Sequence, residues 1–473
     1  MPKASSSLAK PSSASESALV KPLGASSSLV KPSGASESSL VKPLGAPLSG
    51  IGTVPGDKSI SHRAVLLGAM AQGTSHLEGV LDSADVRSSI AAVRALGAVV
   101  DLAKQEDGSL AGTVTGWGDQ GPSSPDDAID CGNSGTTTRL LMGVLAPWDV
   151  EVELVGDASL CRRPMRRITG PLSKMGATFA PEDRDTLPLV VHGTSALHPL
   201  FYRSPVASAQ LKTALLLAGI FAQGKTRVEE PAASRNHTEF MLPGYGVAVE
   251  HGPGWAEVTG PQTMHACDVV VPGDPSSSAF PVCAAALARE SDLTITNISL
   301  NAARIGYIDV LQSLGVQVET IQTATLANEP VGDVHVRYTP RLHGCVVEPE
   351  AIAGMVDEIP VLSLVAARAA GETVFCGAGE LRVKETDRFQ AIIDGLAILG
   401  VKAWGERDDL HIEGNPDLVF DTPLTFDSLG DHRLAMTWAL VGMTGTAPVT
   451  IIDYDCVGIS YPTFQNDMER FAQ

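Results

Sequence analysis

Six stretches of the chain repeat one pattern of polar and apolar positions. Each begins with Ser, Asp or Gly, continues as an apolar run of mostly small residues, and ends in a short stretch rich in β-branched residues. Ser, Asp and Gly are common where helices begin, so the pattern predicts a helix followed by a strand. The stretches recur about every 75 residues, at 59–80, 134–156, 208–230, 276–298, 357–378 and 430–453.

A second helix is predicted after most of these stretches. It ends in Leu-Gly or Met-Gly, and a β-branched strand follows, as at residues 96–97, 175–176, 314–315 and 399–400. Gly directly after the last helical turn is a common C-cap. Six α/β units of similar length indicate internal repeats. The alternative is chance similarity between helices rich in Ala, Leu and Gly, and it accounts poorly for six occurrences in a regular order.

The sequence Val-Pro-Gly-Asp occurs twice, at residues 54–57 and 271–274. Pro-Gly interrupts a strand, and serines and an apolar helical segment follow both copies. The two copies divide the six units into three and three. Because 473 residues exceed one ordinary hydrophobic core, we expect two domains. Only the first copy is followed by the cations Lys58 and Arg63, so we expect stronger anion binding in the first half.

The composition argues against several classes of function. The net charge of −20 disfavours nucleic acid or an anionic membrane surface as a partner. The chain has no apolar run long enough for a transmembrane helix and no apolar signal-peptide core, so we expect a cytoplasmic protein. The seven cysteines form neither a C-x-x-C pair nor a Cys/His cluster, which argues against a zinc site and a disulfide framework.

Residues 1–47 form a low-complexity tail. A unit of about twenty residues occurs twice in tandem, at 5–25 and 26–46, and Lys-Pro recurs throughout. Frequent prolines in a background of Ser, Ala and Lys cannot build a packed core, so we expect the tail to be disordered. A transit peptide is the alternative, since the tail is rich in serine. The prolines and the lack of arginine argue against it.

Cations recur beside the predicted helix starts. Surface charge is the usual explanation for a single Lys or Arg, but it fits this regular placement poorly. Several cations beside helix N-termini suit a pocket for phosphate and carboxylate groups. Asp357 and Glu385 lie among them and suit general acid–base chemistry. The cations in question are Lys58, Arg63, Arg139, Arg162, Arg163, Arg166, Arg167, Lys212, Arg235, Arg382, Lys384, Arg388 and Arg433.

Eight motifs resemble those of the 5-enolpyruvylshikimate-3-phosphate synthase family. They are P-G-D-K-S-I-S-H-R, G-N-S-G-T-T-x-R-L, G-D-A-S-L-x-x-R-P-M, S-A-Q-L-K-T-A-L-L-L-A-G, V-P-G-D-P-S-S-S-A-F, D-E-I-P, E-L-R-V-K-E-T-D-R and G-D-H-R-x-A-M. They follow the family's order and cover residues 50 to about 470. The first and fourth motifs look like the bacterial class II branch.

The resemblance implies a reaction and a fold. The enolpyruvyl group of phosphoenolpyruvate would be transferred to the 5-hydroxyl of shikimate 3-phosphate, with release of phosphate, in aromatic amino acid biosynthesis. The α/β fold would have two lobes, each of three βαβαββ repeats in an inside-out α/β barrel. The N-terminal lobe would comprise residues 57–270, and the C-terminal lobe residues 48–56 and 271–473. We expect no metal or organic cofactor, and a monomer.

The resemblance also implies roles for individual residues. Shikimate 3-phosphate would be bound by Lys58, Ser59, Arg63, Ser208, Ala209, Gln210, Arg235, Asp357 and Lys384. Phosphoenolpyruvate would be bound by Lys58, Asn133, Gly135, Arg163, Gln210, Arg388 and Arg433. The catalytic residues would be Lys58, Asp357 and Glu385. Asp357 would take the proton of the attacking hydroxyl, and Glu385 would protonate the methylene carbon.

Two positions bear on the phosphoenolpyruvate site that the resemblance implies. Ile459 stands where many family members carry a lysine that contacts phosphoenolpyruvate, and Gly135 is the small residue associated with glyphosate sensitivity.

Two alternative functions stay open. One alternative is the sister enzyme that acts on UDP-N-acetylglucosamine, but neither Cys131 nor Cys161 lies in the P-G-G-C-like context of its catalytic cysteine. The other is a catalytically dead scaffold, which the presence of Lys58, Asp357 and Glu385 disfavours.

Overall fold

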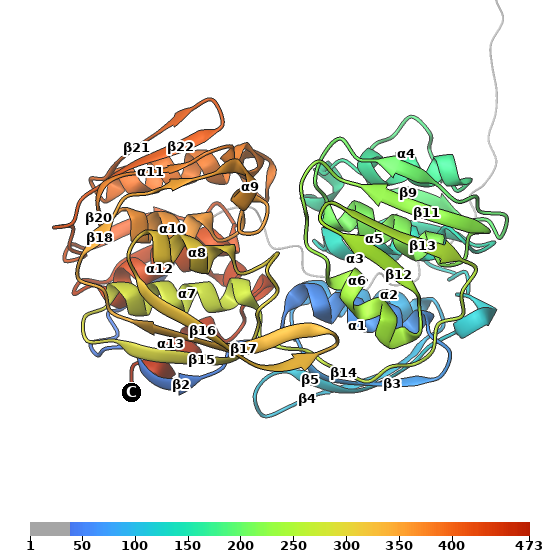
Figure 1. Cartoon of the computed structure of the whole chain (residues 1–473), viewed down its shortest axis with the longest axis horizontal. Helices are drawn as coiled ribbons and strands as arrows, with labels where there is room; N and C mark the ends of the chain where they lie inside the picture. The colour runs from blue at the N-terminus through green and yellow to red at the C-terminus, as the bar shows by residue number, and fades with distance from the viewer. Residues whose placement is uncertain (1–37) are drawn as a thin grey trace, which may run out of the picture. The chain divides into compact units, whose positions relative to one another are not determined.

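The computed structural model describes residues 38–473, and most of the predicted disordered tail lies outside these residues (Figure 1). Buried apolar side chains form two separate cores. One is built from residues 60–271 and the other from residues 41–54 and 279–471. We call the parts around them the N-terminal lobe and the C-terminal lobe, and we keep 57–270 and 48–56 with 271–473 as the proposed boundaries.

The N-terminal lobe contains three four-stranded sheets. In each sheet the first two strands are parallel and the other pairings are antiparallel, as the βαβαββ order requires. The helices are α1 (Lys58–Met70), α2 (Ala84–Ala95), α3 (Gly135–Leu145), α4 (Arg166–Met175), α5 (Ala209–Gly219) and α6 (His237–Met241). The sheets, in spatial order, are β14 (Val269–Val270), β3 (Thr74–Val80), β5 (Leu110–Thr115) and β4 (Val99–Lys104); β6 (Ile129–Asp130), β7 (Glu151–Val155), β9 (Leu189–His192) and β8 (Thr178–Ala180); and β10 (Phe201–Arg203), β11 (Gly224–Glu229), β13 (Trp255–Gly260) and β12 (Val249–Gly252).

The C-terminal lobe repeats this plan, except that its second sheet has an additional short strand and its last sheet has three strands. Its helices are α7 (Pro275–Leu287), α8 (Gly306–Ser313), α9 (Pro349–Ile352), α10 (Ile359–Ala366), α11 (Arg388–Ile398), α12 (His432–Thr444) and α13 (Phe464–Phe471). Its sheets are β2 (Ser49–Gly52), β15 (Asp292–Ser299), β17 (Glu329–Arg337) and β16 (Gln317–Leu326); β18 (Leu342–His343), β20 (Ala369–Phe375), β22 (Asp409–Gly414) and β21 (Lys402–Glu406), with β19 (Val346–Val347) also beside β20; and β1 (Ser38–Val41), β24 (Val449–Ile452) and β23 (Leu424–Asp427).

The chain crosses between the lobes at the two Val-Pro-Gly-Asp copies. Strand β2 precedes the first copy and pairs with β15 of the C-terminal lobe, whereas β14 precedes the second copy and pairs with β3 of the N-terminal lobe. The two copies meet through an antiparallel bridge between Gly56 and Gly273. A Cβ on Gly56 would lie 2.0 Å from the carbonyl oxygen of Gly79, so this crossing requires glycine.

The predicted tail was wrong for residues 38–47. Strand β1 pairs antiparallel with β24, Val41 is buried in the C-terminal core, and Leu44 packs against it. Within residues 38–473 the sixth unit has no β-hairpin after its second helix, α13. In the other five sheets the second strand of this hairpin pairs with the second of the two parallel strands. In the last sheet β1 occupies that position beside β24. The composition of the segment gives no sign of this, because its pairing partner lies about 400 residues away.

Buried helices pack at the centre of each lobe, with the sheets around them (Figure 1). In the C-terminal lobe α7, α10 and α12 pack on one another, and all 13 residues of α7 are buried. A helix that is apolar on every side is stable only in such a position. This is the expected arrangement of helices inside and sheets outside; the three sheets of each lobe share no strand pairing within residues 38–473, so they do not close into one continuous barrel of strands. None of the described helices is long and apolar enough to cross a membrane.

Candidate active site

A cavity of about 740 Å³ is lined by residues of both lobes. The first turns of α1, α3, α5, α7, α11 and α12 contribute to its wall, and Asp357 lies just before α10. Nine Lys or Arg and five Asp or Glu side chains line it. The partial positive charge of several helix N-termini adds to this surplus of cations, so the cavity attracts anions within a chain of strongly negative net charge.

Side-chain caps place these helix starts. Asp57 accepts a hydrogen bond from the backbone N–H of Ile60 at the start of α1, at 2.8 Å. Ser134, Ser208, Asp274 and Asp431 cap α3, α5, α7 and α12 in the same way. A cap satisfies an otherwise unpaired N–H and fixes where the helix begins. The Ser and Asp positions that suggested helix starts in the sequence therefore also set which residues face the cavity.

Asp357 is surrounded by cations of both lobes. Arg235 of the N-terminal lobe contacts its carboxylate at 2.5 Å, while Arg388 and Lys384 of the C-terminal lobe lie at 3.1 and 3.5 Å. Burial raises the pKa of Asp357, but Lys384, Arg235, Arg433 and Arg388 outweigh it and hold that pKa well below its usual range. The carboxylate is therefore ionised at neutral pH and can accept a proton.

Glu385 lies beside the same cluster. Its carboxylate contacts Arg388 at 2.6 Å, and Arg388 is also held by Asp431 at 2.7 Å. Burial raises the pKa of Glu385, and Asp357 also raises it. The opposing attraction of Arg388 is stronger, and His432 adds to it where it is protonated, so the pKa lies below its usual range. Glu385 is an anion in the absence of ligand.

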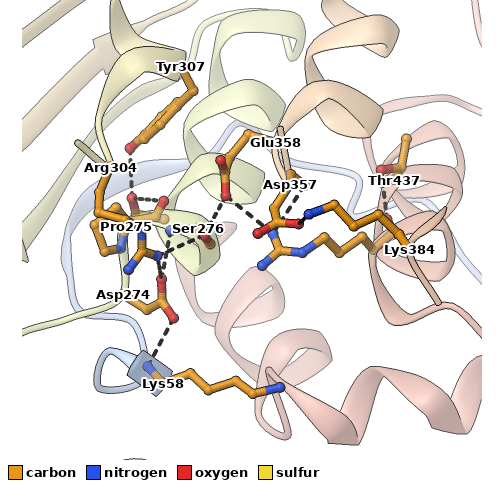
Figure 2. Close-up of polar contacts among 12 residues, drawn as sticks. Lys58, Asp274, Pro275, Ser276, Arg304, Tyr307, Asp357, Glu358, Lys384 and Thr437 are labelled. Carbon is orange, nitrogen blue, oxygen red and sulfur yellow. Dashed lines mark hydrogen bonds and ion pairs between the residues drawn. The ribbon is translucent and has the colours of Figure 1, made fainter. Parts of the chain in front are cut away.

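Lys58 and Arg433 face the cavity from opposite lobes. The ammonium of Lys58 forms an ion pair with Asp85. Its backbone N–H donates to Asp274 at 3.1 Å, as Figure 2 shows. Arg433 donates to the backbone carbonyl of Asp357 at 3.2 Å and to Glu358 at 3.4 Å. Both cations retain donors that an anionic ligand can use.

A row of polar side chains links α3, α5 and the loop before α4. Arg139 donates to the amide oxygen of Gln210 at 3.0 Å, and the amide nitrogen of Gln210 donates to Thr136 at 3.0 Å. Arg163 donates to the amide oxygen of Asn133 at 2.8 Å. These hydrogen bonds fix the orientation of Gln210 and Arg163 before any ligand binds.

Of the site residues predicted from the sequence, all but two line the cavity. The lining residues are Lys58, Ser59, Gly135, Arg163, Ser208, Ala209, Gln210, Arg235, Asp357, Lys384, Glu385, Arg388 and Arg433. Asn133 lies behind Arg163, its hydrogen-bond partner. Arg63 points into the N-terminal lobe, where it donates to Thr238 at 2.7 Å, to Thr213 at 2.9 Å and to the carbonyl of Ser59 at 3.0 Å. Ile459 also lies outside the lining, which Ser460 reaches.

The family resemblance implies no individual role for several residues of this lining, which are Thr136, Arg139, Arg167, Arg304 and His432. Of these, Arg139 and Arg167 are among the cations expected beside the helix starts. Burial and the nearby Arg167 and Arg163 lower the pKa of Arg139 to about 10. Its place one helical turn after Gly135 was a usable signal, because residues four apart share a helix face. Burial lowers the pKa of His432 to about 4, so this side chain is neutral at pH 7.

The fold is that of the enolpyruvyl transferases. An enolpyruvyl transferase, NikO from Streptomyces tendae, superposes with a TM-score of 0.70 at 19% identity, covering 92% of this chain and 98% of that one. The EPSP synthase of Acinetobacter baumannii has a TM-score of 0.82 at 35% identity, with the same coverage.

Sequence comparison narrows the class to one family. The family model for EPSP synthase (3-phosphoshikimate 1-carboxyvinyltransferase) matches residues 43–468. The 3-phosphoshikimate 1-carboxyvinyltransferase of Halorhodospira halophila is 44% identical over 425 residues, which is 90% of this chain and 94% of that protein. Its counterpart from Xanthomonas euvesicatoria is 42% identical over 417 residues, or 88% and 93%. The chain belongs to the EPSP synthase family and is a carboxyvinyl transferase.

Proposed function

We propose that this chain transfers the enolpyruvyl group of phosphoenolpyruvate to the 5-hydroxyl of shikimate 3-phosphate and releases phosphate. The observation that carries the proposal is the position of two ionised carboxylates, Asp357 and Glu385, within a cavity whose lining is predominantly cationic. Both substrates carry a phosphate and a carboxylate, so the cationic excess matches their charge. The carboxylates supply the acid–base groups that the transfer requires.

Shikimate 3-phosphate binds on the N-terminal side of the cavity in this proposal. Ser208 and Ala209 begin α5, and the free N–H groups of that first turn suit a phosphate, with Arg235 as its counter-ion. Ser59 offers a hydroxyl for the ring carboxylate. Arg63 is enclosed by threonines and acts through the carbonyl of Ser59, which it holds, rather than by contact with the ligand.

Phosphoenolpyruvate binds where cations of both lobes face one another. Lys58 and Arg163 come from the N-terminal lobe, and Arg388 and Arg433 from the C-terminal lobe. Arg388 and Arg433 already contact carboxylates or carbonyls of the protein, so their positions are set before binding. Gly135 leaves room beside Arg163 for the ligand.

The reaction proceeds by addition and elimination. Asp357 accepts the proton of the 5-hydroxyl, the hydroxyl oxygen bonds to C2 of phosphoenolpyruvate, and Glu385 gives a proton to the methylene carbon. In the second step that carbon loses a proton, the C2–O bond to phosphate breaks, and the double bond re-forms. The phosphates and carboxylates of the substrates neutralise the surrounding cations, which raises the pKa of Glu385 and lets it carry the proton.

Phosphate release from the purified full chain tests this assignment. Release should require both substrates, and Glu385→Gln should reduce it by at least a hundredfold, whereas Glu413→Gln, an exposed carboxylate paired with Lys402, should leave it unchanged. Release with UDP-N-acetylglucosamine in place of shikimate 3-phosphate would reassign the acceptor. No release with either acceptor would overturn the proposal.

A further inference from the structure

A single arginine lies where the two crossovers of the chain meet. Arg304 follows β15, is 1% exposed, and forms part of the cavity wall (Figure 2). Its guanidinium donates to Asp57 at 2.7 Å and to Asp274 at 2.9 Å. These aspartates end the two Val-Pro-Gly-Asp copies. One side chain therefore connects both points at which the chain passes between the lobes.

The two aspartates orient helices that reach the cavity. Asp57 caps α1, whose first residues are Lys58 and Ser59. Asp274 caps α7 and also accepts the backbone N–H of Lys58 at 3.1 Å. Any shift of Arg304 relative to either aspartate therefore moves the start of α1 and the Lys58 side chain with it.

A second path runs from Arg304 to the opposite wall of the cavity. Arg304 donates to the hydroxyl of Ser276 at 2.9 Å, and that hydroxyl donates to the carboxylate of Glu358 (Figure 2). Glu358 is 1% exposed and accepts a hydrogen bond from Arg433 at 3.4 Å. It also directly follows Asp357 in the chain. This path ties the same guanidinium to the segment that holds Asp357.

We propose that Arg304 is a positioning residue that fixes Lys58 and Ser59 at a set distance from Asp357 and Arg433. The inference rests on the proposed function, because those residues hold the acceptor and the phosphoenolpyruvate in it. The planar fork of a guanidinium can bind two carboxylates and a hydroxyl at once. A lysine ammonium keeps the charge but acts as one compact point, so it cannot reproduce these contacts together with the contact to Nε2 of His237 at 3.0 Å.

A purely structural role makes different predictions. A residue that only stabilises the fold lowers the fraction of folded protein but leaves the turnover of the folded fraction unchanged. A positioning residue lowers kcat in protein that remains folded. It also loosens the two segments that it joins, residues 57–61 and 355–359.

Arg304→Lys in the full chain distinguishes the two roles. Val334→Ala is the matched control, because it removes buried volume from β17 in the same lobe without touching this network. We expect Arg304→Lys to lower kcat at least tenfold at pH 7 and to speed hydrogen exchange at 57–61 and 355–359, with neither change in Val334→Ala. A kcat within twofold of wild type with unchanged exchange would overturn the inference, as would an equal loss in both variants.

Two further results keep the outcome decisive. If Arg304→Lys does not fold, Ser276→Ala is the variant to test, because it interrupts only the path to Glu358. It should lower kcat while the protein stays folded. An unchanged kcat would count against the inference. If the wild type itself releases no phosphate, the proposed function fails. The hydrogen-exchange comparison then still decides whether Arg304 joins the two segments.

Discussion

Because His62 is buried, we expect the folded protein to lose measurable stability in mild acid. His62 lies in α1, is fully buried, and contacts the hydroxyl of Ser89 through Nδ1 at 2.8 Å. Burial lowers its pKa from 6.5 to about 3; Asp85 opposes this shift, and Lys58 and Arg63 add to it. Because the folded-state pKa lies below the unfolded one, the unfolded chain binds the proton between pH 6.5 and about 3. Stability is therefore lost as the pH falls through that window.

The magnitude follows from the difference in proton binding. At pH 5 the unfolded chain gains about 2 kcal/mol from protonating His62, and at pH 7 it gains almost nothing. His62→Asn removes the titrating group, and its amide can still reach Ser89. Loss of the ring leaves a cavity, which lowers the free energy of unfolding equally at both pH values. Only the difference in that free energy between pH 7 and pH 5 therefore reports on protonation of the histidine.

Urea unfolding at pH 7 and pH 5 measures this change. The wild type should lose about 2 kcal/mol more than His62→Asn over this interval. His76→Asn serves as the control, because His76 is exposed, with 66% of its side chain accessible, and this variant should lose as much as the wild type. Equal losses in the wild type and His62→Asn would refute the reasoning, since His62 would then not be held neutral in the fold.

Three further changes test the cavity and the first strand. Gly135→Ala should raise the KM for phosphoenolpyruvate by about tenfold, or ~1.4 kcal/mol, because its Cβ would lie 2.7 Å from Arg139 and 3.5 Å from Arg163; steady-state kinetics measures this. Asp357→Asn should abolish turnover yet tighten binding of inorganic phosphate in calorimetry, because the surrounding cations lose their counter-ion. Val41→Asp should cost about 2–4 kcal/mol in urea unfolding, because it buries a charge beside β24. That loss of stability should be larger in a chain without residues 1–37. Residues 17–25 repeat residues 38–46 with one exception, so the full chain carries a second, unmutated copy of the segment and the shortened chain does not.

The repeat order and much of the site could be predicted because their signals are local. Ser134, Ser208 and Asp431 cap helices at the positions that the sequence pattern indicates. A cap fixes the first turn, and the first turn carries the side chains that face the cavity. The same logic applies to Gly135 and Ala209, each the first residue of its helix.

Other features depend on contacts that no local pattern records. Arg63 lies four residues after Ser59, but α1 is buried from Ile60 to Met70, so periodicity cannot show which face meets the cavity. Val41 is recognisable as a core residue only beside β24. Arg304 lies outside every helix-start motif, and its partner Asp57 is 247 residues away in the chain.

The low pKa values of Asp357 and Glu385 place a constraint on the order of events. Without substrate both carboxylates are anions, so neither of them has a proton to give. Substrate anions that pair with Arg388 and Arg433 weaken the attraction that keeps Glu385 ionised. In the proposed mechanism the acid is therefore formed when the substrates bind and is not already present in the ligand-free protein. Because Arg388 contacts both carboxylates, at 3.1 Å and 2.6 Å, it transmits the presence of the anion to both at once.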